Sequence, residues 1–345
     1  MSALVSIVMP VKRVDKYVTV AIDSILAQQD VDIELLIIGA PDALNTDNAL
    51  AALLDKHYKN DSRVTLVARN KPGIVNALNT GLVHACGSFI ARMDADDIAA
   101  PERLRTQLEL AQTQSENTLI SACVELFSDD HPVQAGNRYY QTWLNQLCTP
   151  SAIRTSCFIE SPMPHPTWFA HKSVWSAIGK YADGDFPEDY DFVLRAWLAG
   201  IPMAKPARTL LRWREHPQRL TRTDSRYRRE AFIQLKALAL SSAEAGLSLD
   251  KGRAVWIVGT GRNARYWHDA LEARQVSVAG FVDFDGTDTQ RQKRDKPVIG
   301  YSDLHKLRKD ALIVTAISNP DARQQLCNWF ADQHMVQGRD VIIGG

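Results

Sequence analysis

The segment that decides the fold is Ser88-Phe89-Ile90-Ala91-Arg92-Met93-Asp94-Ala95-Asp96-Asp97. Apolar residues run into three carboxylates with almost no polar transition. A buried strand that ends in an acidic loop places negative charge at a sheet edge, where open α/β folds bind ligands. A divalent cation shared with phosphate oxygens is the usual way to offset such repulsion. The bland alternative is a solvated turn, because Asp is common in turns and before helices.

Size and composition set the broad class. A chain of 345 residues can form two domains with substantial cores. Lys+Arg and Asp+Glu both number 40, so nothing global predicts nucleic-acid binding, and attraction to a membrane needs a local patch. The five cysteines are scattered without metal-ligand spacing, which is typical of reduced thiols in a cytosolic protein. With no leader and no apolar run of about 20 residues, we expect a cytoplasmic protein, at most peripheral to a membrane.

Alternating strand and helix patterns organise the first part of the chain. Buried strands are predicted at residues 4–9, 33–38, 64–67 and 88–93. Helical spacing predicts helices near residues 18–26, 44–57, 74–82 and 101–111. This order predicts an α/β fold with a doubly wound, mainly parallel sheet.

From about residue 115 the alternation loosens. Residues 118–127 predict one strand, and the region around Tyr139 and Trp143 reads as polar and less regular. Residues 165–169 read as extended. Helices are predicted at residues 173–178, 186–200 and 232–240, and the second of these has carboxylates in its first turn.

The order of short motifs makes a family resemblance plain. Residues 4–225 resemble an inverting family 2 glycosyltransferase of the GT-A fold, whose nucleotide-sugar-binding sheet is mixed. The matching pieces, in the family order, are residues 5–10, 76–81, 91–97, His165-Pro166, Glu188-Asp189-Tyr190-Asp191, His216-Pro217 and 220–222. The resemblance implies a nucleoside-diphosphate sugar as donor.

The resemblance also implies a metal site. Asp94 and Asp96 match the family's Asp-x-Asp pair, which holds Mg²⁺ or Mn²⁺ against the diphosphate, and hard oxygen ligands suit these cations. Asp97 either ligates as well or begins the following turn. His216 resembles a histidine that reaches the metal or diphosphate in some relatives, although a His before Pro is more often structural.

Other residues are assigned to the donor by the same resemblance. Pro10, Asn76, Arg92 and Asp94 are expected to line its site. Relatives usually end the second strand with aspartates, one of which reads the nucleobase, whereas this chain has Ile38-Gly39-Ala40-Pro41-Asp42. Either Asp42 reaches the base, or backbone and residues 69–71 hold it, so a uridine donor does not follow from the sequence.

The proton acceptor is expected in the pair Glu188-Asp189, with Asp189 as the general base by family resemblance. A helix N-terminus lowers the pKa of a carboxyl, and the neighbouring charges of Glu188 and Asp191 raise it. The alternative is that all three acids only favour the helix dipole. His165 either shapes the acceptor side or is a hydrogen-bonded core residue.

A basic segment runs from Arg219 to Arg229 just before a predicted helix. One interpretation is peripheral contact with an anionic membrane that carries a lipid-linked acceptor. The other is a solvated helix that joins two domains. Arg214, Arg219 and Arg222 can pair with phosphate oxygens or form a solvated basic face.

A second domain is predicted after a linker at residues 243–252, giving domains 1–245 and 252–345. A strand at 254–258 leads into Gly259-x-Gly261-x-x-Ala264, a helix, a second strand at 276–282 and Asp283. This is the dinucleotide-binding order, with a further strand at 312–317. Residues 253–343 resemble the small Rossmann-like domains of sugar acyltransferases and nucleotide-sugar dehydratases. That implies a second nucleotide at Gly259, Gly261 and Asp283, against the alternative of a docking or oligomerisation domain.

The leading hypothesis is therefore metal-dependent, inverting hexosyl transfer to a glycan or lipid-linked glycan acceptor, as in capsule or O-antigen synthesis. A sugar-1-phosphate nucleotidyltransferase would need a glycine-rich loop, which residues 10–13 lack. A nucleotide-sugar sensor would have no need to retain Asp94, Asp96 and Asp189 together. An NAD-dependent sugar oxidoreductase is favoured only by the motif in the second domain. The second domain is also compatible with a homo-oligomer.

Overall fold

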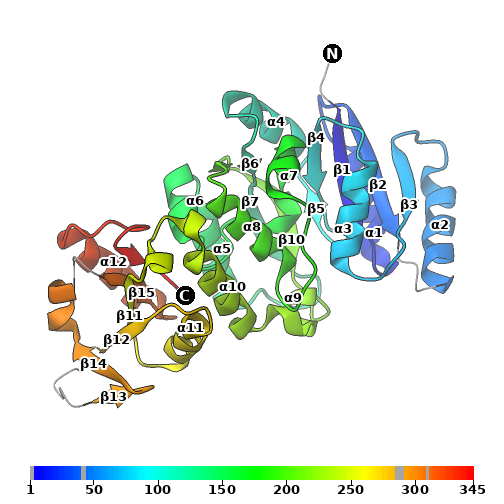
Figure 1. Ribbon diagram of the computed structural model, residues 1–345. Helices are drawn as coiled ribbons and strands as arrows, with labels where there is room; N and C mark the ends of the chain where they lie inside the picture. The colour runs from blue at the N-terminus through cyan, green and yellow to red at the C-terminus, as the bar shows by residue number, and fades with distance from the viewer. Residues whose placement is uncertain (1–3, 40–43, 284–290, 308–310) are drawn as a thin grey trace. The chain divides into compact units, whose positions relative to one another are not determined.

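A computed structural model describes residues 4–39, 44–283, 291–307 and 311–345 (Figure 1). Packing divides the chain into two units. The first comprises Met1–Ile153, Pro162–Asp183 and Gly200–Thr223, and the second comprises Arg154–Ser161, Gly184–Ala199 and Asp224–Gly345. The predicted domains 1–245 and 252–345 are each one continuous segment of the chain. Each packing unit instead consists of three separate segments.

The main sheet of the first unit confirms the predicted doubly wound α/β class. Its strands are β1 Val5–Pro10, β2 Ile33–Gly39, β3 Val64–Ala68, β4 Phe89–Arg92, β6 Leu119–Ile120, β8 Phe169–His171 and β9 Met203–Ala204. Within the described residues their order is β3-β2-β1-β4-β8-β6-β9. The first four are mutually parallel, and β8 is antiparallel to both of its neighbours, so the sheet is mixed.

Helices cover this sheet on both faces because buried strand residues alternate between faces. Helices α1 Lys16–Leu26 and α3 Ile74–His84 lie alongside β1 and β2, and α2 Leu44–Tyr58 lies beside β3 (Figure 1). Ile7 and Met9 share a core with the buried stripe of α1. Val8 faces the other way, toward Gly81 of α3, where an added Cβ would lie 2.3 Å from Val8 Cγ1.

A smaller sheet in the first unit differs from expectation. Residues 118–127 do not form one strand: they divide into β6 and β7 Cys123–Phe127 at Ser121 and Ala122, both fully buried. Strand β7 pairs with β10 Thr209–Arg214, which also pairs with β5 Ile98–Ala99. Strand β10 was not predicted; its residues 210–213 form only a short, mainly apolar stretch in the sequence.

Two further local predictions were wrong. The region around Tyr139 and Trp143 is helical, as α5 Ala135–Gln146, and its apolar side packs on β7. His165-Pro166-Thr167 forms a short 3₁₀ helix, η1 His165–Thr167, instead of an extended segment. The remaining elements of the first unit and its border are α4 Arg103–Thr113, α6 Pro150–Ser156, α7 Ser173–Ile178 and α9 Leu220–Thr223.

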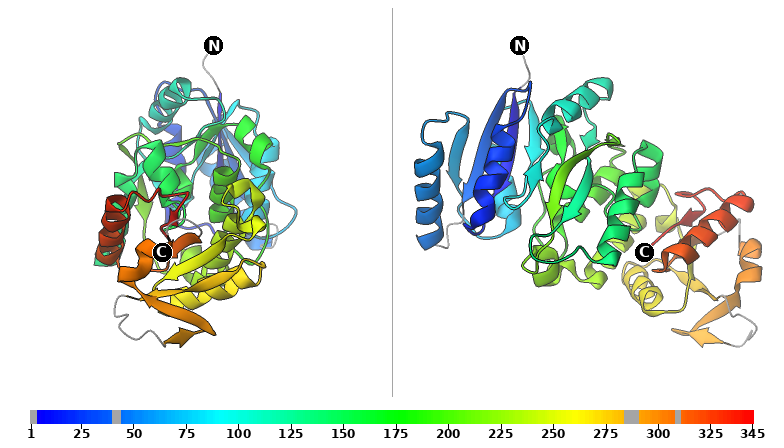
Figure 2. Two further views of the ribbon diagram at one scale, coloured as in Figure 1. Left: turned by 60° about the vertical axis from the view of Figure 1, so that its left-hand side comes forward. Right: turned by 180° about the vertical axis from the view of Figure 1, so that it is seen from behind.

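The second unit contains its own open sheet. Its strands are β11 Ala254–Val258, β12 Val278–Asp283, β13 Gln292–Lys293, β14 Lys296–Gly300, β15 Ala311–Thr315 and β16 Val341–Ile342. Their order is β13-β14-β12-β11-β15-β16, and all neighbours except β13 and β14 are parallel. Strand β14 was not predicted, and it supplies the parallel neighbour of β12 on the side away from β11. Figure 2 shows α11 Arg262–Glu272 in yellow and α12 Pro320–Asp332 in red beside these strands.

Helices from the middle of the chain complete the second unit. They are α8 Glu188–Leu198 and α10 Arg229–Ser241, with the 3₁₀ helices η2 Ser225–Tyr227, η3 Ala243–Ala245, η4 Leu249–Lys251 and η5 Tyr301–Leu307. Helix α10 packs against both α8 and α11, which is why residues before the predicted linker belong to this unit. In the described part of the chain, no helix has the length and apolar character needed to cross a bilayer.

Candidate functional site

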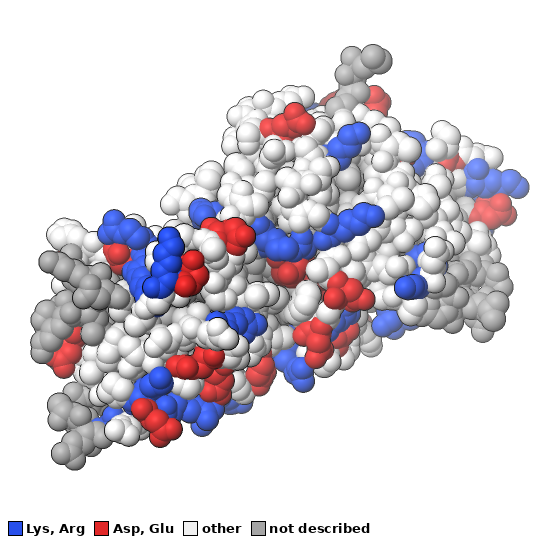
Figure 3. Space-filling view, in the orientation of Figure 1, with Lys and Arg blue, Asp and Glu red and all other residues white. Residues whose placement is uncertain are grey.

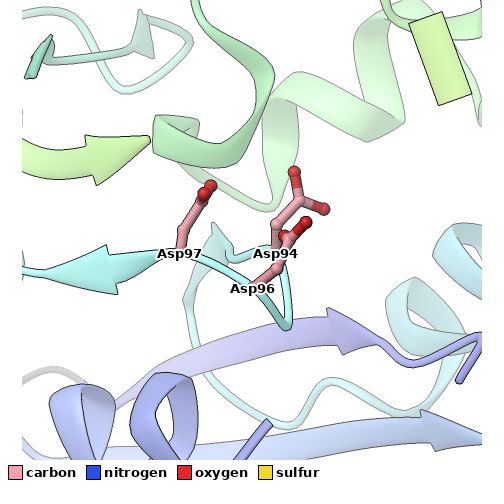
Figure 4. A group of neighbouring side chains, drawn as sticks. All are labelled: Asp94, Asp96 and Asp97. Atoms are coloured by element: carbon pink, nitrogen blue, oxygen red, sulfur yellow. The ribbon is translucent and has the colours of Figure 1, made fainter. Parts of the chain in front are cut away.

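The acidic loop, residues 93–97, is fixed at both ends by backbone pairing. Strand β4 ends at Arg92, and the Met93 N–H still donates to the carbonyl of Val8 at 3.1 Å. On the other side the chain enters β5, which pairs with β10 of the smaller sheet. The loop therefore connects two different sheets. Figure 4 shows the carboxylates of Asp94, Asp96 and Asp97 projecting from it to the same side.

These carboxylates are close enough to share one cation. Each offers a ligand oxygen within 4.8 Å of the others. Asp97 is only 1% exposed; its Oδ1 accepts a hydrogen bond from the Arg214 N–H at 2.8 Å. Its Oδ2 is buried and has no hydrogen-bond partner among the described residues. A buried carboxylate oxygen without a partner is costly, and three hard oxygen ligands fit Mg²⁺ or Mn²⁺.

Protein cations surround the same loop. Arg92 Nη1 lies 2.5 Å from Asp94 Oδ2, and the Arg214 Nε–H donates to the carbonyl of Asp96 at 2.7 Å. His216 Nε2 lies 2.7 Å from Asp96 Oδ2. The structure thus brings His216 to the acidic loop, as the sequence interpretation requires, through a contact with a carboxylate. Whether it also ligates a metal stays a prediction.

The pKa values follow from this crowding. Burial raises the pKa of Asp97 well above its ordinary value, and the charges of Asp96 and Asp94 raise it further. Burial also raises the pKa of Asp96, but the hydrogen bond and charge of His216 outweigh that effect, so the net shift is downward. The hydrogen bond to Asp96 raises the pKa of His216 against the opposing effect of its burial.

The first turn of α8 holds the predicted base. Glu188 is 2% exposed and accepts a hydrogen bond from the Tyr227 hydroxyl, 2.8 Å from its Oε2. Asp191 pairs with Arg195 at 2.7 Å. Asp189 is half-buried, and its Oδ1 accepts from the N–H of Tyr190 at 2.8 Å. Side-chain hydrogen bonds thus connect Glu188 to Tyr227 and Asp191 to Arg195.

Tyr227 was missed in the sequence because it lies within the arginine-rich segment. Burial raises the pKa of its hydroxyl, and the charges of Glu188 and Asp189 raise it further, so the hydroxyl remains a donor. Residues 188, 189 and 227 all belong to the second unit, and the acidic loop belongs to the first. The roles of Asp189 and Glu188 in a common site therefore stay predictions.

Comparisons with known proteins bear on the family of this chain. A family model described as glycosyl transferase family 2 matches residues 6–174. The O-antigen biosynthesis glycosyltransferase WbnJ of Escherichia coli is 31% identical over 195 residues, covering 56% of this chain and 71% of that protein. The chain belongs to glycosyltransferase family 2.

One further relative, one solved structure and a second family model also resemble parts of this chain. The amylovoran biosynthesis glycosyltransferase AmsE of Erwinia amylovora is 26% identical over 174 residues, covering 50% of this chain and 62% of that protein. The crystal structure of Staphylococcus aureus TarS 1-349 in complex with UDP-GlcNAc has a TM-score of 0.51 at 13% identity, covering 79% of this chain and 80% of that one. This likeness shows that the fold is shared. A second family model, the PglD N-terminal domain, matches residues 254–330.

In this family 2 glycosyltransferase two of the predicted donor residues, Pro10 and Arg92, lie at one edge of the main sheet. Pro10 ends β1 and Arg92 ends the parallel strand β4, so both are at the carboxyl edge where open α/β sheets bind ligands. Asn76 lies in the first turn of α3, where its Oδ1 accepts from the Lys71 N–H at 3.3 Å. Asp42 lies outside the described residues.

Gly39, the last residue of β2, is contacted by a buried arginine. Arg69 is buried and donates from Nε to the carbonyl of Gly39 at 3.0 Å. Its Nη1 donates to the carbonyl of Gly73 at 2.6 Å, just before α3. This side chain therefore connects the end of β2 to the start of α3.

The basic segment from Arg219 to Arg229 is largely paired. Arg219 and Arg222 both pair with Glu215, and Arg226 pairs with Asp224 at 2.8 Å. Acidic and basic side chains are interspersed over the face drawn in Figure 3. Pairing leaves less positive charge for an anionic membrane, so peripheral membrane contact stays a prediction.

The glycine-rich loop of the second unit is only partly arranged for a nucleotide. Gly259 has φ +109°, a conformation that favours glycine, and Gly261 faces open space at the start of α11. Asp283, the expected ribose acceptor, already accepts from Thr260 Oγ1 at 2.8 Å and pairs with Arg291 at 2.7 Å. A dinucleotide ribose would have to displace these partners, so the second nucleotide stays a prediction.

Proposed function

We propose that this chain transfers a hexosyl group from a nucleoside-diphosphate sugar to an acceptor hydroxyl, with inversion and with dependence on a divalent cation. Membership of family 2 supports glycosyl transfer as such. The single observation that carries the metal dependence is the buried Oδ2 of Asp97, which has no hydrogen-bond partner in the described part of the chain and lies within a cluster of three carboxylates.

The residues of the acidic loop have distinct tasks in this proposal. Asp94, Asp96 and Asp97 would hold Mg²⁺ or Mn²⁺, which supplies positive charge for the departing diphosphate when bound. Arg92 holds the Asp94 carboxylate and brings a permanent cation to the same edge. His216 holds Asp96 in the same way from the end of β10. These contacts orient the ligand oxygens and limit their movement.

Asp189 would act as the general base. Its carboxylate accepts the proton of the acceptor hydroxyl while that oxygen forms a bond to the anomeric carbon of the donor. The bond from that carbon to the diphosphate oxygen breaks on the opposite face, so the configuration inverts and the electron pair leaves with the diphosphate. Glu188, held by Tyr227, would position the start of α8.

The acceptor class is proposed from the relatives. Those that carry O-antigen or amylovoran biosynthesis in their names suggest a growing surface glycan, free or lipid-linked, as acceptor. A cytoplasmic location near the inner face of the membrane would suit such an acceptor. Arg228 pairs with Asp185, which is consistent with a basic segment that mainly organises its own unit.

For the C-terminal module we propose a nucleotide-sugar site at the loop containing Gly259 and Gly261. Its similarity to the PglD N-terminal domain supports this assignment. The engagement of Asp283 by Thr260 and Arg291 argues against NAD and hence against an oxidoreductase.

A thermal-shift screen tests these proposals. Nucleotide sugars should raise the melting temperature more with Mn²⁺ than without, because ligands that bind the native state stabilise it. Changing Asp94 and Asp96 together to Ala should abolish the metal-dependent part and reduce transfer at least about 100-fold. Undiminished transfer by that double variant would refute the metal-dependent mechanism, and stabilisation by NAD(H) without metal would favour the oxidoreductase.

A further inference from the structure

A fully buried arginine lies beneath the acidic loop. Arg103 begins α4 and its side chain is 0% exposed. Its Nη2 donates to the carbonyl of Arg92 at 2.6 Å, at the residue where β4 ends. Its Nη1 lies 3.2 Å from the Sδ of Met93, and its Nε donates to Gln107 Oε1 at 3.2 Å. All three donor groups thus point at the root of the acidic loop or at one neighbour on α4.

Gln107 extends this arrangement to a distant segment. Its Nε2 donates to the carbonyl of Thr167 at 2.7 Å and to that of Ser121 at 3.1 Å. Thr167 ends η1, the 3₁₀ helix that carries His165, and its Oγ1 accepts from the Ala122 N–H at 3.1 Å. Gln107 is itself 0% exposed, so no solvent competes for these contacts.

The contacts close into a ring. After Arg103 and Gln107 reach the carbonyls of Arg92 and Thr167, the Arg92 N–H donates to the carbonyl of Trp168 at 2.9 Å. A closed set of hydrogen bonds therefore connects the first turns of α4, the end of β4 and the η1 segment. Within η1, His165 Nε2 lies 3.0 Å from the Tyr181 hydroxyl.

A buried guanidinium is expensive to retain for packing alone. Burial lowers the pKa of Arg103 to about 9, with Asp97 and Asp94 acting in the opposite direction, so it is charged at neutral pH. An aliphatic side chain of similar volume would fill the same space without that cost. The position is better explained by the contacts that the guanidinium makes and by its charge beneath three carboxylates.

We propose that Arg103 and Gln107 are a positioning pair that holds the acidic loop and the His165 segment in a fixed relationship. This rests on the proposed function of the acidic loop. Neither side chain is exposed to substrate, so both act through Asp94, Asp96 and Asp97 on one side and through His165 on the other.

Two variants separate this role from simple core packing. Arg103→Lys keeps a positive charge but cannot make all three contacts, and Gln107→Leu keeps the volume but loses the amide. Asn145→Leu is a matched control, because Asn145 also joins a helix to a strand through its amide, with Oδ1 and Nδ2 bonded to the backbone of Val124 at 2.9 and 2.8 Å. Circular dichroism and melting temperature identify which variants fold.

Hydrogen exchange of the full chain is the first measurement. In each folded variant of the pair, amides in residues 88–97 and in residues 163–170 should exchange about fivefold faster together, the effect of losing a buried hydrogen bond. The Asn145→Leu control should leave both segments unchanged. Either folded variant with wild-type exchange in one of these segments would overturn the coupling.

Titration with Mn²⁺ alone is the second measurement. Loss of a group that orients metal ligands typically weakens affinity about 10- to 100-fold, and we expect that range for Arg103→Lys and Gln107→Leu. Wild-type Mn²⁺ affinity in both folded variants would refute a positioning role. If the unsubstituted protein binds no Mn²⁺, the proposed metal site fails, and the exchange data still decide whether the pair couples the two segments.

Discussion

His216 Nε2 lies 2.7 Å from Asp96 Oδ2, so a residue that follows strand β10 of the smaller sheet contacts the acidic loop. We expect His216→Gln, which retains hydrogen bonding without the charge, to weaken Mn²⁺ affinity and transfer by about 10-fold. His216→Ala should cost more, because Asp96 then loses its partner. Steady-state kinetics at several Mn²⁺ concentrations measure both effects. Wild-type kinetics for the Ala variant would show that the contact is only structural.

Substitution of Asp97 should change the stability of the metal-free protein and its affinity for Mn²⁺ in opposite directions. In Asp97→Asn one of three crowded carboxylates becomes neutral, so the metal-free protein should be more stable by about 1 kcal/mol. The same change removes a candidate ligand, so stabilisation by Mn²⁺ should fall. Denaturant unfolding with EDTA and with Mn²⁺ measures the two quantities. A variant that is less stable in EDTA would contradict the electrostatic argument.

Substitutions of Asp189 and Glu188, at the start of α8, should have different effects on transfer. Asp189→Asn should leave donor binding nearly intact and reduce transfer about 10²- to 10⁴-fold, as expected for loss of a general base. Glu188→Gln keeps a partner for the Tyr227 hydroxyl and should reduce transfer much less. Donor affinity by calorimetry and turnover by product assay distinguish these effects. Near-normal turnover in Asp189→Asn would exclude it as the base.

Buried Lys205 gives the stability a pH dependence. Its Nζ donates to the carbonyls of Leu144 and Pro162 at 2.7 and 3.0 Å, and burial lowers its pKa from 10.5 to about 8. Between pH 8 and 10.5 the unfolded chain binds more protons at this site than the native chain, so its contribution to stability rises with pH.

The difference between the two pKa values of Lys205 corresponds to about 3 kcal/mol of unfolding free energy, at about 1.4 kcal/mol per pKa unit. Urea unfolding at pH 7 and pH 10 should show the wild type gaining stability relative to Lys205→Met over this interval. Exposed Lys59, changed to Met, is the control and should show no such difference. A constant gap between wild type and Lys205→Met at both pH values would rule out the depressed pKa.

Two glycine substitutions should act in opposite directions. Gly81→Ala places a Cβ 2.3 Å from Val8 Cγ1 and should destabilise the chain by about 1–3 kcal/mol through overpacking. Gly136, in α5, has nothing within 4 Å of the same added atom, so Gly136→Ala should be stabilising by about 0.5 kcal/mol. Midpoints of denaturant unfolding compare the two. Equal midpoints would contradict the overpacking predicted between residue 81 and Val8.

The sequence predicts the elements whose apolar pattern is unambiguous. Strands β1, β2 and β3 and helices α3 and α8 lie where continuous apolar runs or helical spacing placed them. Strand β10 was missed, and residues 118–127 were wrongly joined. In both cases strands pair across the smaller sheet, and long-range pairing leaves little trace in local pattern.

For the site, the sequence predicts the acidic residues and His216, but few of the residues that hydrogen-bond to the site segments and fix their positions. Asp94, Asp96 and His216 were predicted and lie together, while Arg103 and Tyr227 were overlooked. An arginine near a helix start normally indicates a solvated surface, and only the fold reveals that this one is enclosed. Tyr227 was hidden among arginines whose charge dominated the interpretation of that segment.

The acidic loop leaves one sheet at Arg92 and joins another at Ile98, and both attachments are made by the backbone. Its span is therefore set by architecture, and one inserted residue would have to be absorbed by breaking strand pairing. Engineering that seeks new donors by lengthening loops should therefore leave residues 93–97 at their present length and place insertions elsewhere in the chain.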